Sequence, residues 1–204
     1  MYTAIAIIVF FASFAMMVRE GLWNNLLNVS AFGIAAVTAF GVFQPITIFV
    51  DEKTGGSYTY FLDIVVLWFT FSLVNLVLKV LMQALSGKRV RFKEPFDGLG
   101  GTLVGLVGAY LICGFTMATL HTAPMSRDAF GYGVEGNSRQ AVESEITQAA
   151  GATRPDLVWL GLMETVLSPN SLGGDGFSRS VYVHSYAQHR GAFETAKSWR
   201  VDRK

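Results

Sequence analysis

Three side chains able to do chemistry lie inside one long apolar run, Tyr60 to Gln83: Asp63, Asn75 and Lys79. Such residues in a membrane-spanning segment mark proton or ion paths, or polar ties between helices. Asp63 and Lys79 are 16 residues apart, about 24 Å along a helix, so they cannot pair. We expect both near the ends of a span, with Lys79 reaching toward the headgroups and Asn75 bonded to a neighbouring helix. A proton or ion path is the alternative.

A group of asparagines, Asn24, Asn25 and Asn28, opens the second apolar run. They could line a polar vestibule. They could also belong to an amphipathic helix lying in the membrane interface, with Trp23 dipping into lipid. The sequence slightly favours the interfacial helix.

The histidines and serines of the chain do not have the spacing that metal sites or nucleophilic active sites require. His184 and His189 are five residues apart, which is not the helical i,i+4 spacing of zinc ligands, and His121 is remote from both in sequence. The chain has no G-x-S-x-G sequence and no P-loop sequence. We therefore expect no enzyme activity, no metal, no cofactor and no nucleic acid partner.

The composition indicates where these residues must be positioned. Hydrophobic residues make up 51% of the 204 residues and charged residues 15%, with a net charge of +1, whereas soluble domains carry about 25% charged residues. Residues 1–120 hold 13 charged residues and residues 121–204 hold 18. The first part is typical of membrane and the second of an aqueous tail, and a single cysteine, Cys113, excludes an internal disulfide.

Four apolar runs are long enough to approach or cross a bilayer, which takes about 20 residues. We predict an all-α membrane protein with four transmembrane helices in residues 1–120, at about 2–18, 22–50, 60–83 and 99–120. Pro45 should end or kink the second helix. The first run lacks a preceding positive flank, so we do not expect it to be a cleaved signal peptide.

Basic residues predict the orientation, because Lys and Arg near span ends stay cytoplasmic. The third loop holds the densest cluster, expected at the membrane surface: Lys88, Arg89, Arg91 and Lys93. The first turn holds Arg19, and the second loop is acidic apart from Lys53. The N-terminus and the C-terminal tail should therefore lie outside the cytoplasm.

Small residues at every fourth position form a face on two spans, which allows close helix packing in lipid. These faces are Gly101, Gly105, Ala109 and Cys113 on the fourth span, and Ala31, Ala35 and Ala39 on the second. We favour packing within one subunit over a seam between copies.

The tail, residues 121–204, is expected to be short and partly helical, with amphipathic helices at about 138–150 and 155–167. Pro155 suits a first helical turn, where its missing donor costs nothing. The second helix is apolar nearly all round but too short to span, so we expect it to bury itself in the bundle or at the bilayer surface. Residues 180–186 could be a strand or the start of another helix.

Over about residues 1–120 the chain resembles the CvpA family, the colicin V production proteins of bacterial inner membranes. The resemblance rests on the turn Val18-Arg19-Glu20-Gly21-Leu22-Trp23, on Phe43-Gln44-Pro45, on the third span from Phe61, on Gly87-Lys88-Arg89, and on the glycine-rich segment 96–105.

The resemblance implies a multi-pass inner-membrane protein linked to colicin V export and envelope maintenance. From it we expect a scaffold or accessory role, with the lipid bilayer and a homo-oligomer or other envelope proteins as partners. A small channel or transporter subunit is the alternative. Some relatives carry a periplasmic serine protease, but this tail lacks the length and the nucleophile motif.

Overall fold

The computed structural model describes residues 2–55, 59–85, 92–126, 129–130, 139–149, 151–169 and 176–195, and the described elements are all helical. The helices are α1 (Tyr2–Met17), α2 (Leu22–Thr54), α3 (Thr59–Leu85), α4 (Phe96–Thr119), a short 3-10 turn η1 (Leu120–Thr122), α5 (Arg139–Ala149), α6 (Pro155–Val166) and α7 (Arg179–Thr195).

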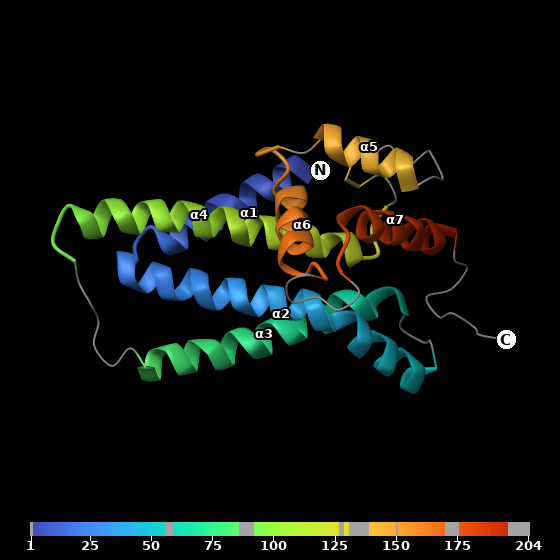
Figure 1. Ribbon diagram of the computed structural model, residues 1–204, viewed down its shortest axis with the longest axis horizontal. Helices are drawn as coiled ribbons and strands as arrows, with labels where there is room; N and C mark the ends of the chain where they lie inside the picture. Colours follow the sequence, from blue (N-terminus) through green and yellow to red (C-terminus); the bar gives the residue numbers. More distant parts are fainter. Residues whose placement is uncertain are drawn as a thin grey trace.

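The four apolar helices run lengthwise through the molecule (Figure 1). Helix α1 packs against α4, α4 against α2, and α2 against α3. Helices α2, α3 and α4 are long and apolar enough to cross a membrane, whereas α1 is apolar but only 16 residues long. Three helices therefore meet the length of a span, and α1, about 24 Å long, approaches it.

Helix α2 continues through Pro45 and ends at Thr54, so the prediction that it ends near residue 50 is short by one turn. Its 33 residues span about 50 Å, more than the roughly 30 Å of a hydrocarbon core. The last part of α2 departs from the direction of the rest (Figure 1), as a proline kink predicts. Part of α2 must therefore lie beyond any bilayer around the bundle.

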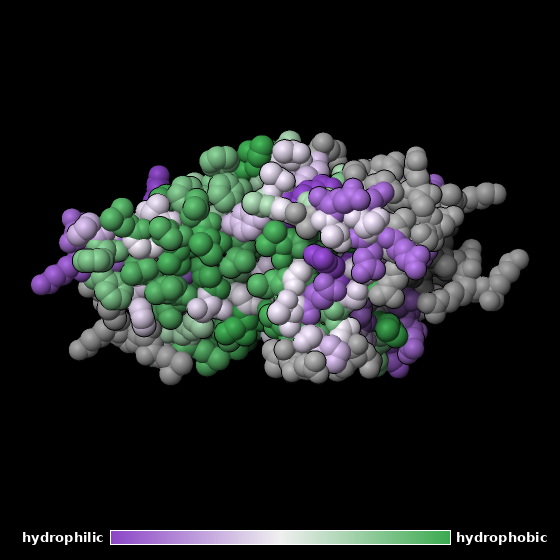
Figure 2. All heavy atoms as spheres, turned by 45° about the horizontal axis from the view of Figure 1, so that its top comes forward, coloured by the Kyte–Doolittle hydropathy of each residue, from purple (hydrophilic) through white to green (hydrophobic). Residues whose placement is uncertain are grey.

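The surface changes character along the molecule. On the face seen in Figure 2, apolar side chains (green) cover the half that contains α1 and the first part of α4, and polar side chains gather over the tail helices. Large side chains on the apolar helices are widely exposed; Phe69, Leu76 and Leu103, for example, expose 68%, 62% and 66% of their area. Such continuous exposure fits lipid as the surrounding solvent.

The tail folds onto one end of the bundle. Helix α6 packs across α4 and also contacts α2 and α7, and α5 packs on α7. At Gly114 of α4 an added Cβ would meet the Pro155 backbone oxygen at 2.7 Å, so the absence of a side chain permits this crossing. Residues 180–186 are helical, within α7.

We call the end of the bundle that the tail covers the tail-helix end. We call the opposite end, where α1 ends and α2 begins, the Glu20 end. At the Glu20 end the turn between α1 and α2 packs against α4. The Leu22 amide donates to an Asp97 carboxylate oxygen at 3.0 Å, and Asn25 Nδ2 donates to the carbonyl oxygens of Gly101 (2.8 Å) and Met17 (3.0 Å). Asn25 is fully buried. The prediction of a separate interfacial helix is wrong, because α2 begins at Leu22 and its first turn is packed against α4.

Candidate functional site

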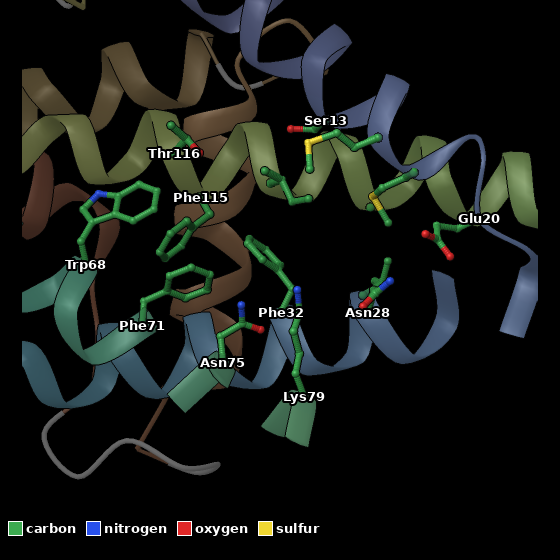
Figure 3. Close-up of a pocket in the computed structure, with 15 residues that line it drawn as sticks. Ser13, Glu20, Asn28, Phe32, Trp68, Phe71, Asn75, Lys79, Phe115 and Thr116 are labelled. Carbon is green, nitrogen blue, oxygen red and sulfur yellow. The ribbon is translucent and has the colours of Figure 1, made fainter. Parts of the chain in front are cut away.

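An open groove lies between α1 and α3, with α2 and α4 forming its floor (Figure 3). Its cavity volume is about 380 Å³, within the range of about 300–1,000 Å³ typical of small-molecule sites. The wall from α1 includes Ser13, and the wall from α3 includes Phe71, Asn75 and Lys79. All four apolar helices contribute side chains, so the groove depends on the bundle as a whole.

Polar side chains gather where the groove reaches the Glu20 end. Glu20, Asn28 and Lys79 line both the groove and an adjoining hollow of about 540 Å³. Asn24 Nδ2 donates to Glu20 Oε2 at 3.0 Å and so orients that carboxylate. Lys79 extends from α3 into the mouth of the groove (Figure 3) and is exposed there. The Glu20 carboxylate and the Lys79 ammonium therefore both line the open end of the groove.

Aromatic rings close the other end of the groove. We call this set the aromatic cluster: Phe32, Phe40, Trp68, Phe71, Phe115 and Trp159. The Phe71 and Phe115 rings lie 4.6 Å apart and the Phe32 and Phe115 rings 5.5 Å apart. Edge-on and tilted ring pairs of this kind add to the stability that burial gives. The cluster separates the groove from the tail-helix end.

A cluster of mostly polar, mostly buried side chains joins the tail to the bundle at the tail-helix end. We call it the junction cluster: Tyr2, His121, Phe130, Asp156 and Arg190. The Tyr2 hydroxyl donates to Asp156, whose other carboxylate oxygen lies 3.2 Å from His121 Nε2. Arg190 Nη1 donates to the His121 carbonyl oxygen at 2.7 Å, and the His121 ring stacks on Phe130 with centroids 3.9 Å apart.

The electrostatics of the junction cluster explain its arrangement. His121 and Asp156 are fully buried and Arg190 exposes 2% of its area. Burying a charge costs several kcal/mol unless it is paired and hydrogen-bonded. Asp156 also lies in the first turn of α6, where the helix dipole favours a negative charge. The contacts join α1, η1, α6 and α7, so they fix the tail on the bundle.

A second polar hollow of about 410 Å³ lies beside α7 at the same end, and Gln44, Asp63, Tyr186 and His189 line it. Burial raises the pKa of Tyr182 and Tyr186 above the ordinary value and lowers that of His189. Tyr186 and His189 therefore stay neutral at pH 7. The hollow can accept a small polar group, with Asp63 as its carboxylate.

The predicted small-residue face of α4 lies against α1 and the following turn. An added Cβ at Gly101 would meet the Glu20 carbonyl oxygen at 3.0 Å, and one at Gly105 would meet Met17 Cβ at 3.4 Å. Ala109 is buried, and Cys113 Sγ donates to the Ala6 carbonyl oxygen at 3.3 Å. Ala31, Ala35 and Ala39 of α2 expose at most 1% of their area. These contacts are all within one chain.

The predicted polar residues of α3 are kept apart. Asp63 lies at the tail-helix end and Asn75 in the groove, on opposite sides of the aromatic cluster. The buried Asn75 Oδ1 has no hydrogen-bond partner among the described residues, so the structure shows no tie from this oxygen to another helix. Of the predicted basic surface, Lys93 is exposed, and Lys88, Arg89 and Arg91 lie outside the described residues.

Sequence reasoning missed the junction cluster. Its members are far apart in the sequence, with 154 positions between Tyr2 and Asp156, so no local spacing links them. The signal in the sequence is Asp156, an acid in the first turn of a mostly apolar helix that is too short to span.

Comparison with known proteins gives one match. A family model described as Colicin V production protein matches residues 2–147. The match extends from α1 to near the end of α5, so it includes the groove, His121 and Phe130, but not Asp156 or Arg190. No curated protein and no solved structure matches the chain.

Proposed function

The chain belongs to the colicin V production protein family, and on that premise we propose that it is a non-enzymatic accessory protein of the bacterial inner membrane. In this proposal it serves colicin V export and envelope maintenance as a scaffold. The proposal has three parts: how the chain crosses the membrane, which side carries the tail, and what the folded tail does there.

We infer four spans, with α1 as the fourth. Helix α1 runs beside α4, from Tyr2 at the tail-helix end to Met17 at the Glu20 end. Its exposed side chains are apolar; Ile8 and Phe11, for example, expose 68% and 60% of their area. Its length of about 24 Å is near the hydrocarbon thickness, and a small mismatch is accommodated by local thinning of the bilayer.

The basic residues support an orientation with the Glu20 end in the cytoplasm. Arg19 and Lys93 both lie at that end, and the sequence places the other basic residues of the third loop beside Lys93. The tail-helix end, with α5, α6 and α7, then lies outside the cytoplasm. This side is the one on which an exported protein and the cell envelope are met.

The aromatic cluster carries the proposal of a scaffold rather than a conduit. The polar residues of the groove and those around Asp63 lie on opposite sides of it. Asp63 and Asn75 are 12 residues apart on α3, about 18 Å along the helix, and packed rings occupy the space between them. The junction cluster meanwhile fixes the tail to the bundle, as a docking platform requires.

The direct test is colicin V secretion from cells that lack this chain. Wild type should restore secretion, and a variant that separates the α1–α2 turn from α4, Gly101→Leu, should not. Gly33→Leu is the matched control, because an added Cβ at Gly33 meets nothing within 4 Å. Equal secretion with and without the chain would contradict the proposed role.

The alternative is a small channel subunit, and the polar mouth of the groove is the observation that favours it. Purified protein in liposomes separates the two functions. A scaffold gives no ion or proton flux above empty liposomes and, in mild detergent, co-purifies with a stoichiometric envelope protein. Flux that falls in Asp63→Asn and Asn75→Leu would instead establish a channel.

A further inference from the structure

We propose that the groove between α1 and α3 binds one phospholipid whose headgroup carries a primary ammonium beside its phosphate, as in phosphatidylethanolamine. The groove would hold the headgroup between Glu20 and Lys79 and one acyl chain against the aromatic cluster. This inference depends only on the membrane setting, so it is independent of the proposed role in export.

Lys79 supplies the first argument. It lies six residues from the end of α3, about 9 Å along the helix, and its side chain points into the groove (Figure 3). Among the residues that the structure describes, no carboxylate lies within 4.0 Å of its ammonium. Lys79 is exposed at the mouth of the groove, where an ammonium attracts an anionic group, and a lipid phosphate supplies one.

Glu20 supplies the second argument, because it selects between headgroups. An anionic lipid would be attracted by Lys79 but repelled by the Glu20 carboxylate at the same mouth. A zwitterion with its ammonium outermost satisfies both charges. A primary ammonium can also donate hydrogen bonds to Glu20, which Asn24 holds in place, whereas a trimethylated ammonium has no N–H to donate.

The order of side chains along the groove matches the order of groups in such a lipid. From the Glu20 end inward come Glu20, then Asn28 and Lys79, then Asn75, and then the rings of Phe71 and Phe115 (Figure 3). The lipid presents an ammonium, a phosphate, an ester and an acyl chain in the same sequence. The Asn75 amide lies at ester depth, and the aromatic cluster lies at acyl depth.

The size of the groove favours an acyl chain over a helix of another protein or of a second copy. A helix with side chains is about 10 Å across and rises 5.4 Å per turn, which is on the order of 400 Å³ per turn. The cavity of about 380 Å³ would therefore hold only about one turn. A single acyl chain is narrower than a helix with its side chains, so it suits a groove of this size better.

The test uses the full chain purified in detergent and three lipids with identical acyl chains: phosphatidylethanolamine, phosphatidylcholine and phosphatidylglycerol. Native mass spectrometry should show one retained phosphatidylethanolamine per monomer, with weaker retention of the other two. Thermal stability should rise most with phosphatidylethanolamine, because a ligand of the folded state stabilises it.

Two variants locate the site. Lys79→Gln should weaken retention of phosphatidylethanolamine about tenfold or more, the effect of losing a hydrogen bond to a charged group. Glu20→Gln should abolish the preference over phosphatidylglycerol. Lys93→Gln is the matched control, since Lys93 is an exposed cation at the same end but does not line the groove, and it should bind as wild type does.

Three results would overturn the proposal. The first is equal retention of all three lipids by wild type, which would mean nonspecific lipid in the groove. The second is a preference for phosphatidylglycerol that Lys79→Gln removes, which would mean an anionic lipid site. The third is a dimeric mass that retains no lipid, which would mean that a second copy fills the groove. If Lys79→Gln fails to fold, the wild-type selectivity and Glu20→Gln still decide.

Discussion

At the scale of single residues, the Asp156 carboxylate links two partners in the junction cluster. It accepts from Tyr2, lies 3.2 Å from His121 Nε2, and is fully buried. Removing one partner of a buried charged network leaves the others without compensation, which costs about 3–5 kcal/mol. Because the Asp156 carboxylate is buried, it should contribute more to the free energy of unfolding than an exposed acid at the start of a short helix would.

We therefore expect Asp156→Ala to lower the free energy of unfolding by about 3–5 kcal/mol and to expose the tail to protease. Glu164→Ala is the matched control on the same helix. Its ion pair with Arg179 is partly exposed, with 40% of the Glu164 side chain and 30% of the Arg179 side chain open, so its loss should cost about 0–1 kcal/mol. Thermal unfolding in detergent and limited proteolysis measure both, and equal losses for the two variants would show that the junction cluster contributes nothing special.

His189 predicts a pH dependence. Burial lowers its pKa below the ordinary value of 6.5, while nearby Asp63 opposes that shift and Arg190 adds to it. The unfolded chain then binds a proton that the folded chain does not. The stability from neutral His189 is fully present above pH 6.5 and is lost as the pH falls through the lower folded pKa.

The tail should consequently loosen on acidification from pH 7.5 to pH 5, and His189→Gln should lessen that change. His184→Gln is the control on the same helix, because His184 bonds to Gln188 on the same helix. Protease sensitivity of the tail against pH is the measurement. An identical pH profile in wild type and His189→Gln would exclude this histidine as a source.

At the scale of elements, the crossing of α4 with its neighbours is controlled by glycine. At Gly101 an added side chain meets backbone atoms of the α1–α2 turn at 3.0–3.1 Å, and backbone cannot rotate away. Overpacking of this kind costs about 1–3 kcal/mol. By contrast, an added Cβ at Gly98 of α4 or at Gly33 of α2 would meet nothing within 4 Å.

Gly101→Leu should therefore lower the thermal midpoint in detergent, while Gly98→Leu on the same helix should leave it within about a degree or two of wild type. The reason is steric contact alone, since both changes add the same apolar side chain to α4. Unchanged stability in Gly101→Leu would mean that the turn is free to move away from α4.

The elements differ in how far the sequence predicts them. Long apolar runs interrupted by charged turns predict the helices well, because hydropathy and length suffice to define them. The sequence does not predict how the start of α2 packs, because Asn25 is typical of a membrane interface and its partner, the Gly101 carbonyl of α4, is 76 positions away. The junction cluster depends on contacts between distant segments, which periodicity in one segment cannot reveal.

At the scale of the whole molecule, one end is closed by the tail and the other carries an open groove with charges of both signs. The exposed apolar surface between them fits a bilayer (Figure 2). In the proposed arrangement, the folded tail lies on one side of the membrane and the groove opens toward the other.

The membrane arrangement tests this division most directly, through cysteine labelling in intact cells. In a Cys113→Ser background, which retains a donor for the Ala6 carbonyl, single cysteines replace the exposed residues Lys93 and Gln188. A membrane-impermeant maleimide should label Gln188→Cys in intact cells and Lys93→Cys only after lysis. The reverse pattern, or labelling of both in intact cells, would contradict a tail folded on the outer face of an inner-membrane bundle.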